Sequence, residues 1–125
     1  MVLLVDTHIF CWWFYEPERL PRKAFKVMGG AEKVFVSSAS IWEIAIKVRL
    51  GKMNADPKEL FEQIEANGFQ ELPVRSKHAL LVADLPMHQT DPFDRLLIAQ
   101  AMSEPMHLLT ADPQLRQYSE LVIQV

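Results

Sequence analysis

Short apolar runs recur along the chain, separated by stretches of mixed polarity. The runs are rich in Val, Leu, Ile or Phe and occupy Val2–Val5, Val34–Val36, Gln70–Leu72, His107–Leu109 and Leu121–Val125. Runs this short, bounded by turn residues, are typical of strands buried in a sheet. The pattern therefore predicts a strand at each of these places.

Helix signals occupy the stretches between the runs. Glycine commonly follows a helix end, and Asp followed by Pro is typical of a helix start. The expected helices are Pro21–Met28 before Gly29-Gly30, one from Ser38 or Ser40 to about Leu50 before Gly51, one from Asp56-Pro57 to Asn67-Gly68, one from Asp91-Pro92 to Met102, and a short one after Asp112-Pro113. Strands that alternate with helices predict an α/β fold, with a mostly parallel central sheet covered by helices on both faces. A length of 125 residues fits a single domain spanning residues 1–125.

Composition narrows the class of protein. Apolar residues make up 50% of the chain and charged residues 23%, which is the balance of a folded globular protein. Cys11 is the only cysteine, which excludes an internal disulfide and a multi-cysteine zinc site and favours a reducing, cytoplasmic location. No apolar run approaches about 18 residues, the length that spans a membrane, so we expect no membrane segment and no signal peptide.

Charge is distributed unevenly along the chain. The formal net charge of −3 argues against a protein that coats nucleic acid in general. From Arg19 to Lys52, however, the chain carries eight basic residues and two acids, whereas the remainder carries five basic and fourteen acidic residues. Such a basic segment could guide a phosphate backbone toward an acidic site, although solvated helix faces are the commoner reason for a charge run.

Several acids stand where strands end or helices begin. Asp6 and Asp112 follow apolar runs, and Asp94 lies in the first turn of an expected helix. Each has an ordinary structural explanation, because Asp caps helices and acids suit the first helical turn. Asp56 also precedes a proline and has no assigned function, so the Asp-Pro dipeptide alone is uninformative.

Glu43 has a strong structural explanation as well. Ser40 and Glu43 fit a capping box, and Glu43 and Lys47 fit an ion pair one helical turn apart. The neighbours of Glu43 are nevertheless apolar, so we expect its carboxylate to be half-buried, and burial without a partner is costly. A metal ion would be one such partner.

The acids gain meaning when they are considered together. In a parallel α/β sheet, the strand ends and the adjacent helix starts share one edge, where these carboxylates can converge. Converging acids repel one another unless a cation binds between them. Oxygen ligands with open coordination positions suit Mg²⁺ or Mn²⁺ better than zinc. The expected site is formed by Asp6, Glu43, Asp94 and Asp112.

The motifs around these acids resemble those of the PIN-domain family, specifically the VapC-type toxin ribonucleases of type II toxin–antitoxin modules. The matching motifs are Val5-Asp6-Thr7, Ser37-Ser38-x-Ser40-x-x-Glu43, the run Asp-Pro-Phe-Asp-Arg-Leu-Leu-Ile-Ala-Gln-Ala from Asp91 to Ala101, and Leu109-Thr110-Ala111-Asp112. Their order and spacing fit over essentially the whole chain. The run from Asp91 is the most specific, because no helix-building rule requires it.

The resemblance implies an endoribonuclease that uses Mg²⁺ or Mn²⁺ and activated water to hydrolyse RNA phosphodiesters. It gives catalytic and metal-binding roles to the same positions, namely Asp6, Glu43, Asp94 and Asp112. It further implies that the chain is the toxin of a toxin–antitoxin pair, with a cognate antitoxin protein as partner and a homodimer as assembly.

Supporting residues are also implied by the family motifs. Thr7 and Thr110 match positions whose hydroxyls could orient ligands or water. Asp91 could act behind the metal ligands, although helix capping explains it at least as well. Arg95 could contact a phosphate or equally pair with a neighbouring acid.

Aromatic residues are concentrated from Phe10 to Tyr15. Most of them are expected in the core, the usual place of such side chains. Adjacent positions on a helix cannot all face inward, so Trp12 or Trp13 could be exposed to bind the antitoxin or a second copy of the chain. Stacking of nucleic-acid bases on these rings is the weaker alternative.

Other functions fit the length but not the residues. A phospho-acceptor receiver domain needs an acid pair at the first strand and a late lysine, whereas Asp6 stands alone and no lysine follows Lys77. A haloacid-dehalogenase phosphatase needs Asp-x-Asp, and His8 occupies the second acidic position. The more serious alternative is a catalytically silent PIN-like module that binds RNA or protein. The retained acids disfavour it, because a binding module does not need their electrostatic cost.

Overall fold

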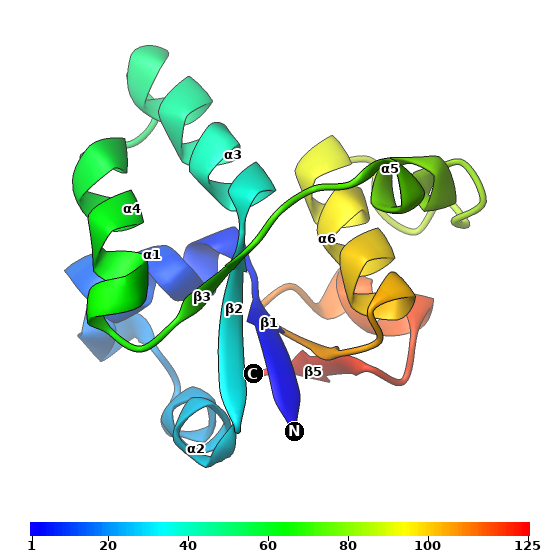
Figure 1. The fold of residues 1–125 in the computed structure, drawn as a ribbon, viewed down its shortest axis with the longest axis horizontal. Coiled ribbons are helices and arrows are strands. Elements are labelled where there is room, and N and C mark those ends of the chain that lie inside the picture. The colour runs from blue at the N-terminus through cyan, green and yellow to red at the C-terminus, as the bar shows by residue number, and fades with distance from the viewer.

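A parallel sheet of five strands forms the centre of the fold, which the computed structural model describes for all of residues 1–125 (Figure 1). The strands are β1 (Val2–Val5), β2 (Lys33–Ser37), β3 (Gln70–Leu72), β4 (His107–Thr110) and β5 (Val122–Gln124). Their order across the sheet is β3-β2-β1-β4-β5, and every pairing is parallel. The predicted parallel sheet is therefore confirmed, with β1 in its middle.

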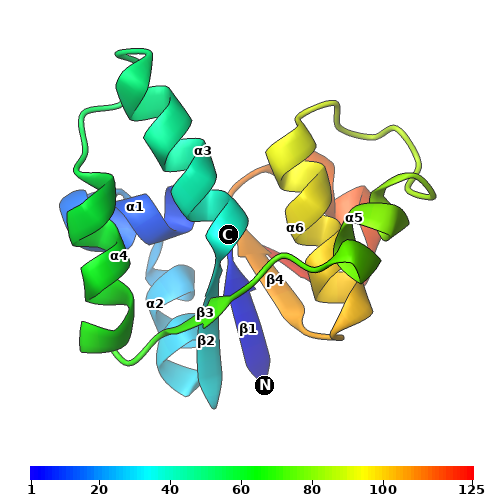
Figure 2. The same cartoon turned by 45° about the horizontal axis from the view of Figure 1, so that its top comes forward.

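Helices connect the strands and cover both faces of the sheet, as the sequence predicted (Figures 1 and 2). The α-helices are α1 (Thr7–Tyr15), α2 (Arg22–Gly30), α3 (Ser38–Arg49), α4 (Pro57–Ala66), α5 (Ser76–Val82) and α6 (Pro92–Ser103). Two 3₁₀ helices, η1 (Pro17–Arg19) and η2 (Pro113–Tyr118), complete the connections. None of the helices combines the length and the apolar character that crossing a membrane requires.

The alternation of side chains along the strands divides the core into two parts. Leu3 and Val5 of β1 point to the face covered by α1, α2, α3 and α4, where Phe10 and Ile44 are fully buried. Leu4 points to the other face and packs in the cluster that contains Leu97 and Ile98 of α6. Strands buried on both faces explain why the sequence shows continuous apolar runs.

Some boundaries differ from the sequence predictions, and each difference has a local reason. α2 continues through Gly29 and Gly30, because its cap is formed by the Ala31 amide on the Met28 carbonyl. α5 was not predicted, since Ser76–Val82 is short and its N-cap residue is Arg75, which is not a typical helix-capping residue. The last predicted helix is a 3₁₀ segment, η2.

The topology places several helix starts beside one edge of the sheet. β1 lies between β2 and β4, so the residues that follow these strands meet at their carboxyl ends. α1 and α3 begin there directly after β1 and β2, and η2 begins shortly after β4. α6 begins at the same edge, because its Asp94 lines one hollow with residues that follow β1 and β4. This edge carries the acids that the sequence singled out.

Candidate active site

Asp6 follows β1 and is fixed by two donors. Its Oδ1 accepts the amide of Ile9 at 2.9 Å, which makes Asp6 the N-cap of α1, and its Oδ2 accepts the hydroxyl of Thr110. Only 4% of Asp6 is exposed. Burial raises the pKa of Asp6 above its ordinary value, although the hydrogen bonds from Thr110 and Ile9 favour the charged form. The carboxylate is therefore oriented but deprived of water.

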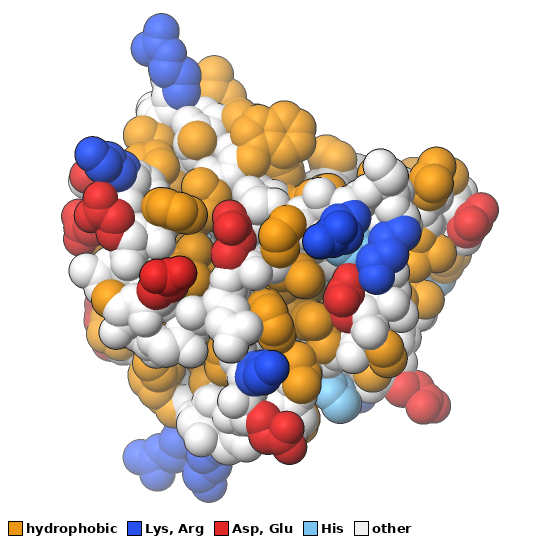
Figure 3. Space-filling view, in the orientation of Figure 1, with side chains coloured by type: hydrophobic (Ala, Val, Ile, Leu, Met, Phe, Trp, Pro, Cys, Tyr) orange, Lys and Arg blue, Asp and Glu red, His pale blue; other side chains and the backbone are white.

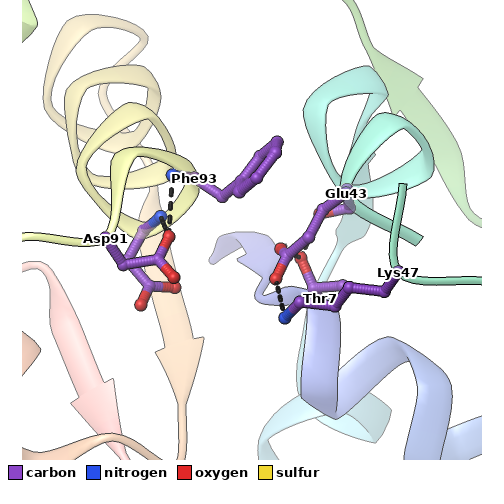
Figure 4. A network of polar contacts seen from close by, with 7 residues as sticks. Thr7, Glu43, Lys47, Asp91 and Phe93 are labelled. Carbon is purple, nitrogen blue, oxygen red and sulfur yellow. Dashed lines mark hydrogen bonds and ion pairs between the residues drawn. The ribbon is translucent and has the colours of Figure 1, made fainter. Parts of the chain in front are cut away.

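Glu43 on α3 is more deeply buried than the sequence suggested, with 3% of the residue exposed. Its Oε1 accepts the hydroxyl of Thr7 at 2.7 Å, and its Oε2 pairs with Nζ of Lys47 (Figure 4). The predicted ion pair with Lys47 is confirmed. The predicted capping box is wrong, because Ser37 caps α3 through the amide of Ala39, and the Oγ of Ser40 lies 2.9 Å from the Thr7 hydroxyl instead.

Lys47 brings a positive charge from α3 toward the acids. Burial acts to lower the pKa of Lys47, but the hydrogen bond and charge of Glu43 and the charges of Asp91 and Asp94 outweigh it and raise that pKa. Lys47 is thus a protein-supplied cation that neutralises Glu43 and lies in the field of the acids on α6.

Asp91 performs the capping role that the sequence gave as the simpler explanation. Its Oδ1 accepts the amides of Phe93 at 2.8 Å and Asp94 at 3.1 Å, which fixes the first turn of α6 (Figure 4). The charge of Asp91 also raises the pKa of Asp94. Burial is the larger cause, and no other acid contributes as much as Asp91. Asp91 therefore positions Asp94 and acts on it electrostatically as well.

Asp94 is the acid without a protein partner. Its carboxylate makes no hydrogen bond and no ion pair with any other side chain or amide. Burial raises its pKa to about 7, with further contributions from four other acids, namely Asp91, Asp6, Glu43 and Asp112. These contributions show that the negative charges of the predicted site lie within electrostatic reach of one another.

Asp112 caps η2 and connects to its surroundings through amides. Its Oδ1 accepts the amide of Gln114 at 2.9 Å, and its Oδ2 accepts Nε2 of Gln89 at 2.9 Å. Thr110 links Asp112 to the rest of the site, because its hydroxyl oxygen accepts the Asp112 amide while its proton is donated to Asp6. The resemblance implied supporting roles for Thr7 and Thr110, and the hydroxyl of each donates to one of the predicted acids.

A hollow of about 330 Å³ collects part of the predicted site. Its lining residues are Asp6, His8, Trp12, Arg19, Asp94, Ala111 and Asp112. Glu43 is not among them, but its charge raises the pKa of both Asp6 and Asp94. The structure therefore brings three of the four acids to one hollow and keeps the fourth beside it, bound to Lys47.

The donor set suits a hard divalent cation, although no ready-made coordination shell exists. All of the candidate ligands are carboxylates, the type of donor that Mg²⁺ and Mn²⁺ prefer. No three of them converge closely enough to hold an ion in their present rotamers. Asp6, Glu43 and Asp112 already use both of their oxygens on protein donors. Asp94 alone of the four has both carboxylate oxygens free of protein donors, and displacement of Lys47 would free one oxygen of Glu43.

Arg95 does not occupy the position that the sequence suggested. It is 8% exposed, and its guanidinium donates to a group of loop oxygens rather than to an acid. The acceptors are the carbonyls of Val82, Leu85, Pro86 and Gln89 and the hydroxyl of Tyr118. Consecutive helical residues point about 100° apart, so Arg95 faces the loop before α6 while Asp94 faces the hollow. A phosphate contact by Arg95 is therefore not supported.

The two tryptophans have different surroundings. Trp13 packs against Phe25 and Phe69, with ring centres 5.5 and 5.8 Å away, and is partly buried against the core. Trp12 lines the acidic hollow, and Cζ of Arg19 lies 4.8 Å above its ring. Arg19 was missed as a site residue, because nothing in its local sequence distinguishes it from the other basic residues of its segment.

Comparisons with known proteins identify the family and agree with the fold. Residues 3–121 match the sequence profile of the PIN domain. The chain is 29% identical over 118 residues to Ribonuclease VapC22 of Mycobacterium tuberculosis, covering 93% of this chain and 91% of that protein. Two solved structures share the fold. VapBC2 from Rickettsia felis, bound to a DNA fragment from its promoter, has a TM-score of 0.70 at 12% identity, covering 100% of this chain and 98% of its own. A toxin–antitoxin complex from Klebsiella pneumoniae has a TM-score of 0.67 at 15% identity, covering 98% of this chain and 96% of its own.

Proposed function

The chain belongs to the PIN-domain family, and on that premise we propose that it is an endoribonuclease dependent on Mg²⁺ or Mn²⁺, with residues 1–125 as one nuclease domain. The observation that carries the proposal is the state of Asp94. This carboxylate is half-buried, has no protein partner and shares a hollow with Asp6 and Asp112. A group of acids that the protein leaves partly uncompensated is best explained by a cation that it binds in order to work.

Each residue has a distinct part in the proposed site. Asp6 and Asp94 would hold the cation, Glu43 would be available to it once free of Lys47, and Asp112 would complete the site or position the attacking water. When bound, the cation would supply Lewis-acid activation of water and neutralise the scissile phosphate. Hydrolysis by in-line attack would leave a 5′-phosphate and a 3′-hydroxyl.

The chain's own contacts keep these ligands in place. The Ile9 amide and Thr110 hold Asp6, and Thr7 holds Glu43. Asp91 fixes the turn that carries Asp94. Ligands held by a rigid shell of hydrogen bonds lose little entropy when the cation binds.

The direct test is cleavage of total RNA by the purified chain with Mg²⁺ or Mn²⁺, beside a reaction with EDTA and a reaction with the Asp94→Asn variant. We expect cleavage that requires both the metal and Asp94. Sequencing of the fragment ends then identifies the substrate. Metal binding without cleavage of any RNA would indicate a very narrow substrate, whereas neither cleavage nor metal binding, in a folded protein, would favour the catalytically silent binding module instead.

We also propose that the chain is the toxin of a toxin–antitoxin pair and acts in the cytoplasm as a homodimer. The structural neighbour from Klebsiella pneumoniae is a toxin–antitoxin complex, and the chain is similar to Ribonuclease VapC22 over most of its length. This chain exposes apolar side chains around α3 (Figure 3). Trp42 of that helix is 61% exposed. Trp42 and Phe93 line a mainly apolar hollow, so a protein partner would find apolar area to bury there. Light scattering of the purified chain, alone and with the protein encoded beside its gene, tests both assemblies.

A further inference from the structure

A second hollow adjoins the acidic one and shares a wall with it. It measures about 280 Å³, near the lower limit of sites for small ligands. Both hollows are lined by His8, Trp12 and Arg19. The second one continues to Tyr15, Glu16 and Lys52, away from Asp6, Asp94 and Asp112. A chain-like ligand could therefore lie over the acids and cross these three side chains into the second hollow.

The shared wall combines rings with a positive charge. The His8 and Trp12 ring centres lie 6.0 Å apart, and the Arg19 guanidinium lies over the Trp12 ring at 4.8 Å. Arg19 is exposed, and its one acidic contact, with Glu16, is long at 3.4 Å. Aromatic rings and arginine planes are the groups on which unpaired bases stack, and arginine also contacts phosphates.

Lys52 adds a second positive charge at the far end of this hollow. It is exposed and takes part in no ion pair or side-chain hydrogen bond. The first hollow has three carboxylates and Arg19, whereas the second has Arg19, Lys52 and one acid, Glu16, so the formal charge of the lining changes from negative to positive. A phosphate backbone would be repelled over the acids unless a cation is bound, but attracted beyond the shared wall.

We propose that this second hollow is a nucleotide-binding subsite for single-stranded RNA next to the bond that is cut. A base stacks on Trp12 and His8, and the neighbouring phosphate contacts Arg19 and Lys52. The inference rests on the proposed ribonuclease function and deepens it, because it names the feature of the substrate that the protein holds beside the metal site. The inference also distinguishes among the basic residues of the segment from Arg19 to Lys52. Arg19 and Lys52 line the subsite, whereas Lys33 begins β2 at the opposite edge of the sheet.

RNA binding without cleavage provides the test. In the Asp94→Asn background, a fluorescein-labelled pool of random ten-nucleotide RNA is titrated by anisotropy with Mg²⁺ present. We expect Arg19→Gln and Lys52→Gln each to weaken binding by about tenfold, and the charge-matched control Lys33→Gln to leave it unchanged. Each of the two variants should also reduce the slope of log affinity against log salt by about 0.7, the value of one phosphate contact on a single strand.

Trp12 gives an independent readout. RNA binding should quench the protein's tryptophan fluorescence, and Trp12→Phe, which keeps a ring in the partly buried position, should remove most of that quenching. With the Asp94 side chain restored, Arg19→Gln should raise the KM for RNA more than it lowers kcat.

The possible outcomes separate this inference from the function on which it rests. RNA affinity and salt dependence that are the same for Arg19→Gln, Lys52→Gln and Lys33→Gln overturn the subsite, while metal-dependent cleavage by the parent chain would leave the ribonuclease proposal standing. Unchanged RNA binding together with a changed oligomeric state assigns the hollow to protein contacts and also overturns it. Absence of cleavage by the parent chain, by contrast, counts against the ribonuclease proposal itself.

Discussion

The starts of α4 and α6 have the same local chemistry but different roles in the molecule. In both, an aspartate caps the helix, a proline follows it, and an acid stands third, as in Asp56-Pro57-Lys58-Glu59 and Asp91-Pro92-Phe93-Asp94. In both, Oδ1 of the capping aspartate accepts the next free amides. Glu59, however, is exposed, whereas Asp94 lies half-buried in a hollow with Asp6 and Asp112. The motif caps the helix in both cases, but only at α6 does the fold bring it beside other acids.

The largest expected effect separates the two helix starts by activity. Asp94→Asn should reduce RNA cleavage by at least about a hundredfold, because it removes the one open ligand of the proposed metal site. Asp56→Asn should leave the rate within about twofold, since asparagine also caps helices well. Cleavage assays with Mg²⁺ or Mn²⁺, on variants shown by circular dichroism to be folded, measure both. Equal rates for the two variants would remove the distinction between the helix starts.

Protons should compete with the metal at α6. The pKa of Asp94 is raised to about 7 in the metal-free protein, so a proton must leave this carboxyl before it can bind a cation at lower pH. Metal affinity should therefore fall by about tenfold between pH 8 and pH 6, as the ionised fraction of one group with this pKa falls. Calorimetric titration with Mn²⁺ at both pH values tests this. Asp56→Ala should retain the full pH dependence, and an affinity that is flat with pH in that protein would contradict the assignment.

Stability should respond with opposite signs at the two helix starts. The pKa of Asp94 in the folded protein lies above the ordinary value of 3.8, so its contribution to stability is present below pH 3.8 and is lost as the pH rises through about 7. At pH 7.5 in EDTA, Asp94→Asn should raise the free energy of unfolding by roughly 1–2 kcal/mol, after allowance for the partial exposure of the group. Asp56→Ala should lower it by about 1 kcal/mol, because a cap is lost.

Urea unfolding at pH 5 and pH 7.5 measures these changes. The gain from Asp94→Asn should be smaller at pH 5, where the wild-type carboxyl keeps its proton in the folded state. A gain that is the same at both pH values would show that something other than the carboxylate charge is responsible.

The smallest effect concerns the lysines near the two helix starts. Lys47 pairs with Glu43 beside the site, whereas Lys58 is exposed in the first turn of α4. Lys47→Met should tighten metal binding by about threefold, because a competing cation is removed, and Lys58→Met should have no effect. Calorimetry on the two variants decides this. Weaker metal binding by Lys47→Met would instead mean that the lysine holds Glu43 in its productive position.

The sequence predicted the parts of the site that follow from local rules. Asp6 and Asp112 were placed after strands, Asp91 was expected as a cap and Glu43 as the partner of Lys47, and the structure shows each of these arrangements. The sequence did not predict that Arg95 faces away from the hollow, because its acceptors include carbonyls of the loop before α6. Arg19 was missed because nothing in its local sequence distinguishes it from the other basic residues of its segment, and Gln89 because its partner Asp112 is distant in the chain.

The sequence by itself determined the α/β class, the parallel sheet and the acids at strand ends and helix starts, because periodicity, capping and strand burial act over a few neighbouring residues. Only the tertiary structure decided which of those acids share a hollow. It separated Asp94 from Glu59, buried Glu43 against Thr7 and Lys47, and placed Arg19 over Trp12. The physical reason is that burial and charge repulsion depend on the packing of elements far apart in the chain, and these two effects set the pKa of Asp94 near 7.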